Sequence, residues 1–179
     1  MEDETKQKRE RNEKLERIAV SGASGFIGSG LCAYFERQGV EVVRLSRGLF
    51  EAGKEDALQS ALESCEAVIH LAGAPIQKWW SSKYRDELYS SRILTTRRLV
   101  KAIRALSVKP SVVVSASAIG FYKSDNGIYT EYSGLKGSGF LSDLCEAWEF
   151  EARKLPPEVR LVRARFGMVL SSRGGLCPE

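Results

Sequence analysis

The sequence predicts a protein of the α/β class, with a doubly wound parallel sheet and helices on both faces of that sheet. Short apolar runs alternate along the chain with longer segments of helical periodicity. Gly22, Gly25 and Gly28 lie between the first apolar run and the first helical segment. Because strands that alternate with helices are typical of parallel βαβ units, both observations favour the same fold class.

The order of the elements follows directly from this alternation. Strands are expected over 17–21, 40–45, 67–71, 111–115 and 159–163. Helices are expected over 26–38, 55–64, 82–107 and 140–152. The Lys109-Pro110 pair ends the longest helix, because proline cannot continue one.

Length and charge narrow the class of protein. The 179 residues suit a single domain with a sizeable core. The net charge is only +4, and the basic residues are scattered among acidic ones, which argues against a nucleic-acid partner. Residues 1–16 are a mixed charge run without an apolar segment, so we expect a charged extension there and the domain over 17–179.

Cysteine usage and hydropathy exclude further classes. The 4 cysteines are widely spaced and the chain has a single histidine, so neither a disulfide framework nor a metal site is expected. No apolar run approaches the length that crosses a bilayer, so no membrane association is expected. A cytoplasmic location follows as an expectation.

The three glycines predict a turn that holds a dinucleotide. Gly22 permits a tight turn, Gly25 lets the backbone approach a pyrophosphate, and Gly28 lets the helix pack closely on the sheet. The N–H groups and the positive dipole end of that helix favour phosphate. A glycine triplet can also be purely structural, but here a strand precedes it and an amphipathic helix follows. The residues expected to contact the cofactor in this turn are Gly22, Ser24, Gly25, Phe26, Ile27 and Gly28.

The end of the second strand predicts which dinucleotide binds. An acidic side chain at this point would bind the ribose hydroxyls of NAD, whereas an arginine accommodates the 2′-phosphate of NADP. The strand ends in Ser46-Arg47, which offers a guanidinium and no carboxylate. NADP(H) is therefore favoured, with NAD(H) as the alternative if Arg47 is an ordinary solvated loop residue.

Six stretches carry a resemblance to a known family: SGASGFIG at 21–28, AVIHLAGAPI at 67–76, SRILTTRRLVKAI at 91–103, SASAIGFY at 115–122, FLSDLCEAWEFEA at 140–152 and RFGMVLSSRGG at 165–175. In this order they resemble the extended short-chain dehydrogenases/reductases, in particular the atypical branch of epimerase family proteins, which are similar to nucleoside-diphosphate-sugar epimerases. The resemblance implies a Rossmann domain that binds NADP(H). It also implies that Leu71, Ala72 and Gly73 lie beside the adenine and its ribose.

The chain departs from the family pattern in two places. Between Arg47 and Ala67 the family usually fits an additional strand, so either the sheet is one strand short after Arg47 or the crossover is distorted. The family also continues beyond the segment at 165–175 into a smaller substrate-binding lobe. That C-terminal lobe is expected to be absent from this chain.

The resemblance also locates catalytic candidates. Most family members use a tyrosine and a lysine in a YxxxK motif, but Leu141 and Cys145 occupy those positions here. Ser117 matches the family serine that holds the substrate oxygen. Tyr122 follows five residues later and could replace the missing proton donor.

Two further residues lie at positions that matter in related enzymes. His70 stands where asparagine is often found, and a histidine at a strand end is expected to be structural. Arg92 stands where related enzymes present an asparagine toward the active site. It could pair with a phosphate or remain solvated.

The expected function is therefore an NADP(H)-dependent oxidoreductase or epimerase-like activity on a small carbonyl or sugar-nucleotide substrate, with hydride transfer as the reaction. The alternative is a non-catalytic dinucleotide-binding sensor or interaction protein, linked in some relatives of this branch to cell or organelle division. Without a lobe to hold substrate, the chain is expected to bind cofactor and to be catalytically silent. Apolar surface left uncovered would favour self-association, including a homodimer.

Overall fold

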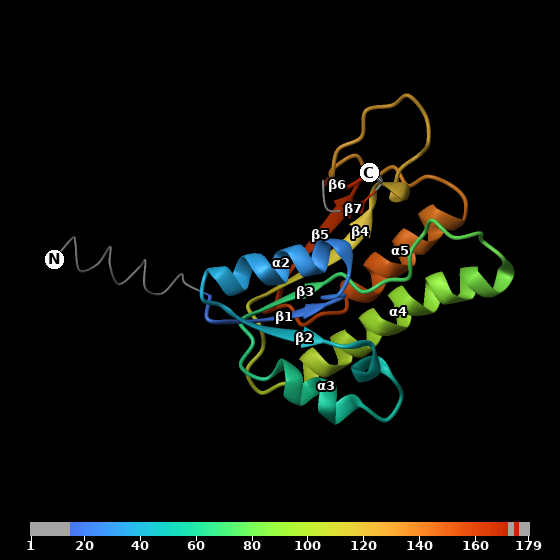
Figure 1. Cartoon of the computed structure of the whole chain (residues 1–179). Helices are drawn as coiled ribbons and strands as arrows, with labels where there is room; N and C mark the ends of the chain where they lie inside the picture. The colour runs from blue at the N-terminus through green and yellow to red at the C-terminus, as the bar shows by residue number, and fades with distance from the viewer. Residues whose placement is uncertain (1–14, 172–173, 176–179) are drawn as a thin grey trace.

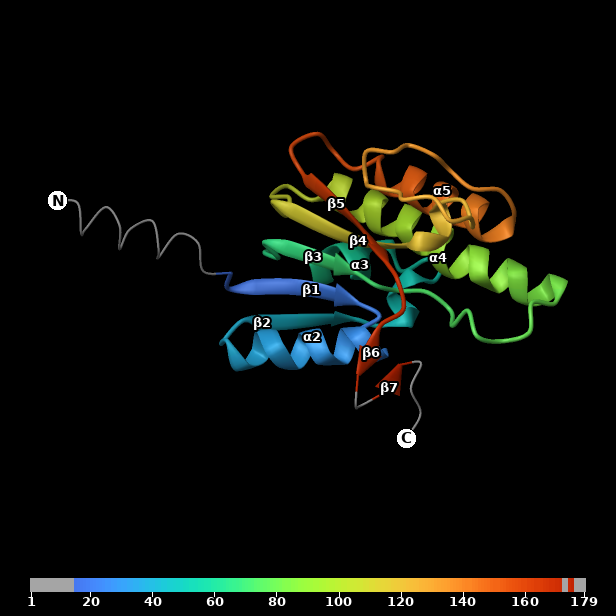
Figure 2. The ribbon, with the colours of Figure 1, turned by 90° about the horizontal axis from the view of Figure 1, so that it is seen from above.

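Each apolar run that predicted a strand forms one strand of a central parallel sheet. The strands are β1 (Arg17–Ser21), β2 (Glu41–Leu45), β3 (Ala67–His70), β4 (Val112–Ala118) and β5 (Arg160–Phe166). Their order is β2-β1-β3-β4-β5, as Figure 2 shows from above. The computed structural model describes residues 15–171 and 174–175, so the extension expected over 1–16 lies almost entirely outside the described residues.

The periodic segments form helices at the expected places (Figure 1). The helices are α2 (Phe26–Arg37), α3 (Glu55–Leu62), α4 (Ser82–Ala105) and α5 (Phe140–Ala152). Short 3₁₀ turns, η1 (Arg47–Phe50) and η2 (Ile119–Phe121), follow β2 and β4. A small antiparallel pair, β6 (Leu170–Ser171) with β7 (Gly174–Gly175), follows β5.

Helices cover both faces of the sheet, because side chains alternate between the faces along each strand. Ile18 and Val20 of β1 pack in one apolar cluster with Cys32 of α2. Ala19 lies between them in sequence and packs in another cluster with Leu99 of α4. Helices α3 and α5 contact α4 on this second face. The prediction of a doubly wound α/β fold is confirmed.

The connection between β2 and β3 contains no strand, and all of its residues are described. It consists of η1 and α3, so the sheet has one strand fewer than the family pattern, as expected, and the crossover is an ordinary helical one. The chain adds β2 on one side of β1 and then crosses over to add β3 on the other side. At such a switch point the carboxyl ends of β1 and β3 border the crevice where ligands bind in open α/β sheets. Among the described residues, none of the helices combines the length and apolar character needed to cross a membrane.

Candidate functional site

The glycine turn after β1 is packed so tightly that side chains are excluded from it. Gly22 has a φ of +70°, and a Cβ atom on it would lie 2.9 Å from the carbonyl carbon of Leu71. A Cβ atom on Gly28 would collide with the carbonyl oxygen of Gly22, so α2 starts directly against the turn. Gly25 donates its N–H to the oxygen of Gly22 at 3.0 Å and precedes the first residue of α2. The backbone is therefore held in one conformation.

The first turn of α2 is free to meet an anion. In the part of the chain that the structure describes, no side chain caps the helix, and no acidic residue lies in its first turn. The N–H groups at the start of a helix lack intrahelical partners, and the helix dipole places partial positive charge there. The predicted contacts Ser24, Phe26 and Ile27 lie in or next to this turn, so the arrangement fits a pyrophosphate.

The loop after β3 is anchored to the end of β1. Ser21 accepts hydrogen bonds at its Oγ from the backbone N–H groups of Leu71 at 3.2 Å and Ala72 at 3.3 Å. The N–H of Leu71 also lies 3.2 Å from the carbonyl oxygen of Ser21. The loop at 71–73 therefore lies beside Gly22 at the switch point, where a dinucleotide would contact both.

His70 belongs to the structure of this anchor. Its Nδ1 lies 2.6 Å from Ser21 Oγ and its Nε2 lies 2.9 Å from Thr96 Oγ1. Because Thr96 donates its hydroxyl to the carbonyl of Arg92 at 2.6 Å, Thr96 accepts from Nε2–H, and Nδ1 accepts from Ser21. Complete burial lowers the pKa of His70 to about 4. The imidazole is thus neutral near pH 7, in agreement with the expected structural role.

Arg92 lies half-buried under the same loop, so its side chain is only partly solvated. Its Nη2 donates to the carbonyl of Ala74 at 2.9 Å, and its Nη1 to the carbonyl of Leu88 at 3.3 Å. The neighbouring Ser91 accepts the N–H of Ala74 at 3.0 Å. Helix α4 therefore holds both main-chain polar groups of Ala74.

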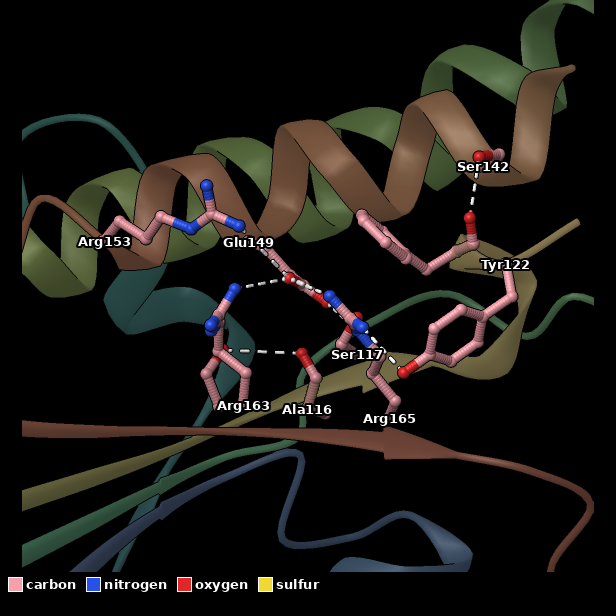
Figure 3. Close-up of polar contacts among 10 residues, drawn as sticks. Ala116, Ser117, Tyr122, Ser142, Glu149, Arg153, Arg163 and Arg165 are labelled. Atoms are coloured by element: carbon pink, nitrogen blue, oxygen red, sulfur yellow. Dashed lines mark hydrogen bonds and ion pairs between the residues drawn. The ribbon is translucent and has the colours of Figure 1, made fainter. Parts of the chain in front are cut away.

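The side chain of Ser117 belongs to a buried ion-pair network (Figure 3). Its side chain is 3% exposed, and its hydroxyl donates to Glu149 Oε1 at 2.7 Å. Glu149 also accepts from Arg165 Nε at 2.7 Å and Nη2 at 2.9 Å, and from Arg163 Nη1 at 2.8 Å. Burial raises the pKa of the Glu149 carboxyl, but the hydrogen bonds from Arg165 and Ser117 and the two positive charges outweigh burial. The net pKa is lowered, so Glu149 is ionised.

Tyr122 meets the same network from the loop beyond η2 (Figure 3). Its phenolic oxygen accepts from Arg165 Nη1 at 2.8 Å, and its ring stacks on Tyr129 with centroids 5.6 Å apart. The structure therefore links Ser117 to Tyr122 through Glu149 and Arg165. The Ser117 proton is engaged by Glu149, whereas Tyr122 acts here as an acceptor and retains a proton that it can donate.

Arg47 lies at the carboxyl end of β2, as the sequence predicted, and its side chain is 80% exposed. Its nearest acidic partner is Glu87 of α4, at 3.8 Å. Because such exposed pairs contribute little, Glu87 does not prevent the guanidinium from binding a phosphate. Cys145, in the position of the family lysine, is buried, and burial raises the pKa of its thiol.

Glu149 and its two arginines were not among the site residues predicted from the sequence. One signal could have revealed them: Arg163 ends the strand expected over 159–163 and Arg165 follows two residues later, so in a strand that continued to Arg165 both would face the same side and need an acidic partner. In the described part of the chain, no group of three or more histidine, cysteine or acidic residues is arranged to hold a metal ion.

Comparison with known proteins places this geometry in a family. Residues 18–136 match the model of the NAD dependent epimerase/dehydratase family. The epimerase family protein SDR39U1 homolog, chloroplastic, of Arabidopsis thaliana is 31% identical over 175 residues, which cover 88% of this chain and 50% of the relative. The epimerase family protein YfhF of Bacillus subtilis is 33% identical, with coverages of 89% and 57%. The chain thus spans about half the length of these curated relatives.

Two solved structures have the same fold at appreciable sequence identity. Human epimerase family protein SDR39U1 with NADPH superposes with a TM-score of 0.78 at 34% identity and covers 89% of this chain and 56% of its own. The nucleoside-diphosphate sugar epimerase of Corynebacterium glutamicum superposes with a TM-score of 0.75 at 29% identity, with coverages of 91% and 36%. Since the family model matches more than half of the sequence, from β1 to the loop before α5, the chain belongs to the NAD dependent epimerase/dehydratase family.

Proposed function

We propose that this chain binds NADP(H) at the carboxyl ends of β1 and β3, and that the whole protein uses the cofactor in hydride transfer to or from a carbonyl or sugar-nucleotide substrate. The observation that carries the proposal is the closed glycine turn. Gly22 lies against Leu71 and Gly28 against Gly22, which leaves the uncapped start of α2 beside the loop at 71–73. The proposed cofactor contacts are Gly22, Ser24, Gly25, Phe26, Ile27, Gly28, Arg47, Leu71, Ala72 and Gly73.

The choice of NADP(H) over NAD(H) rests on Arg47. Its guanidinium stands after β2, where the ribose of a dinucleotide bound at the glycine turn would lie, and only NADP(H) offers a 2′-phosphate there. The similar human protein was solved with NADPH, which supports the same choice for this chain. The name of the Corynebacterium glutamicum protein supports a sugar nucleotide as the substrate class.

For catalysis we propose Tyr122 as the proton donor and Ser117 as its partner in the same network. The nicotinamide supplies or accepts the hydride when the cofactor is bound. Tyr122 can give its proton to a substrate oxygen, and Arg165 would stabilise the phenolate that remains, because its N–H already points at that oxygen. Ser117 holds Glu149, which keeps Arg165 in place. The activity of the whole protein belongs to this proposal, and the relatives' names give no support to a non-catalytic sensor.

We also propose that the chain forms a homodimer through α4 and α5. These helices pack side by side and leave Tyr89, Leu94 and Phe150 exposed at 45%, 38% and 56%. Burying such side chains against a second copy is favourable. Size-exclusion chromatography with light scattering measures the mass directly, and a monomer at micromolar concentration would contradict the proposal.

A titration with NADPH, followed by its nicotinamide fluorescence, tests the cofactor proposal. Gly25→Val should abolish binding, because the branched side chain would occupy the space of the pyrophosphate. Gly30→Val is the matched control. Gly30 lies in α2, the helix that begins directly after Gly25, and a Cβ atom on Gly30 meets nothing within 4 Å. Equal NADPH affinity in a folded Gly25→Val variant would contradict the proposal.

A further inference from the structure

Arg92 holds a positive charge that no carboxylate balances in the described part of the chain. Its two hydrogen bonds go to the carbonyl oxygens of Ala74 and Leu88, and among the described residues no carboxylate is one of its charged neighbours. By contrast, Arg165 on β5 binds both carboxylate oxygens of Glu149. Backbone carbonyls satisfy N–H groups but carry no net charge, so the electrostatic cost of burying Arg92 is only partly offset.

Part of the Arg92 guanidinium remains available to a ligand. A guanidinium has five N–H groups, and Arg92 uses Nη1 and Nη2 in its two bonds. Among the described residues its Nε has no hydrogen-bond partner, and this atom is not fully buried, so it reaches solvent. The guanidinium also lies against the backbone at Gly73, where a Cβ atom would come within 3.0 Å of Cζ. It is therefore next to the loop proposed to contact the cofactor.

The indole of Trp148 adds a second unused donor at this place. Trp148 lies on α5, is 6% exposed, and its ring centre is 5.3 Å from Cζ of Arg92. Its Nε1–H is buried, and no residue that the structure describes accepts a hydrogen bond from it. A buried donor without an acceptor is costly, and most such groups in proteins have one. An acceptor is therefore missing close to an unbalanced cation.

These observations call for one type of ligand group. An oxyanion would balance the charge of Arg92 and accept charge-assisted hydrogen bonds from its guanidinium. The cofactor phosphates already have proposed sites at the start of α2 and at Arg47, on the other side of β3 in the strand order. An anion at Arg92 would thus belong to another molecule bound beyond β3, toward β4 and α5.

We propose that Arg92 and Trp148 form a subsite for an oxyanion of the substrate, a carboxylate or a phosphate. The assignment to the substrate rests on the proposed function, because it presumes that the cofactor occupies the glycine turn. The subsite makes Arg92 a specificity-determining residue: it selects substrates that carry negative charge near the reacting carbon.

Acetate and inorganic phosphate, titrated at constant ionic strength, serve as probes, with acetamide as the neutral isostere of acetate. Tryptophan fluorescence reports binding at Trp148, and Trp148→Phe identifies that part of the signal. The wild-type protein should give a saturable response to at least one of the anions and none to acetamide; which anion is stronger separates a carboxylate from a phosphate site. Arg92→Gln keeps an N–H donor for Ala74 but removes the charge, and it should weaken anion binding about ten-fold or more.

Three controls make the outcome decisive. Arg92→Lys, which keeps the charge, should retain anion binding, and Arg104→Gln, an exposed site on the same helix, should leave it unchanged. In the unaltered protein, phosphate should slow the modification of Arg92 by phenylglyoxal more than that of Arg104, as mapped by mass spectrometry. This measurement does not depend on whether a variant folds. Equal protection of both arginines, or anion binding in Arg92→Gln equal to wild type, would overturn the subsite.

The same samples test the cofactor proposal independently of the anion subsite. NADPH binding is read from nicotinamide fluorescence in the same samples. If NADPH does not bind while acetate or phosphate still binds through Arg92, the proposed function is wrong and the anion site stands. If NADPH binds and the anions do not, only the subsite is wrong.

Discussion

The imidazole of His70 and the hydroxyl of Ser21, 2.6 Å apart on neighbouring strands, connect the sheet to the loop at 71–73. In this chain of hydrogen bonds each group donates to the next, from the loop to helix α4. Thr96 accepts from His70, His70 accepts from Ser21, and Ser21 accepts from the N–H groups of Leu71 and Ala72. Thr96 of helix α4 therefore influences the position of the loop at 71–73 indirectly, through His70 and Ser21.

Thr96→Val should weaken NADPH binding although Thr96 lies away from the proposed contacts. The valine removes the acceptor for His70 Nε2–H, so the imidazole can turn and release Ser21. Loss of such a buried partner costs about 1–3 kcal/mol in stability, and we expect lower affinity in addition. Thr95→Val is the control, because the hydrogen bonds of the Thr95 hydroxyl to described residues stay within α4. Fluorescence titration at a temperature where both variants are folded compares them; equal affinities would refute the effect.

Acid should destabilise the fold through His70 before the carboxylates protonate. The folded-state pKa of His70 is lowered to about 4 from 6.5, so between these values the unfolded chain binds more protons than the folded one. Stability therefore falls as the pH decreases from 6.5 toward 4, by about 3 kcal/mol at most for this group. Urea unfolding at pH 7.0, 6.0 and 5.0 measures the slope. His70→Gln should flatten it, and an unchanged slope would exclude His70 as its origin.

Glu149→Gln should be among the most destabilising single substitutions in the chain. The amide leaves Arg163 and Arg165 close together without their counter-charge, and breaking a buried pair in this way costs about 3–5 kcal/mol. Glu146→Gln on the same helix is the control, because Glu146 is exposed and its one ion pair with a described residue is to Lys136. The free energy of unfolding from denaturant titration decides: similar values for the two variants would mean that the network contributes little.

Arg47→Ala should lower the affinity for NADPH and leave that for NADH nearly unchanged. Only NADPH loses a charged hydrogen bond, worth roughly 1.5–3 kcal/mol. Glu87→Gln removes the carboxylate that faces Arg47 and should keep or slightly raise NADPH affinity. If Arg47→Ala weakens both dinucleotides equally, Arg47 does not read the 2′-phosphate.

The sequence was sufficient for the strands of the parallel sheet, the four α-helices and the glycine turn, since these depend on local patterns, but β4 and β5 continue beyond their expected ends at 115 and 163. Strand β1 is an apolar run, and Gly22 and Gly28 are needed for steric reasons that a motif records. The environment of Arg92 could not be predicted, because it depends on which helix faces which loop. The same holds for Ser117: its match to a family serine says nothing of Glu149, which approaches from a helix 32 residues further along the chain.

The short crossover between β2 and β3 has a consequence for how the sheet ends. Strand β2 is the outermost strand of the described sheet, so its outer backbone groups have no neighbouring strand to pair with. Glu41 and Arg44 are the charged residues of this edge strand, and they pair with Arg17 and Glu36. Such charges discourage the addition of a strand from another molecule. In the proposed complex the adenosine half of the dinucleotide would then lie at the rim of the sheet, with Arg47 as its outermost contact.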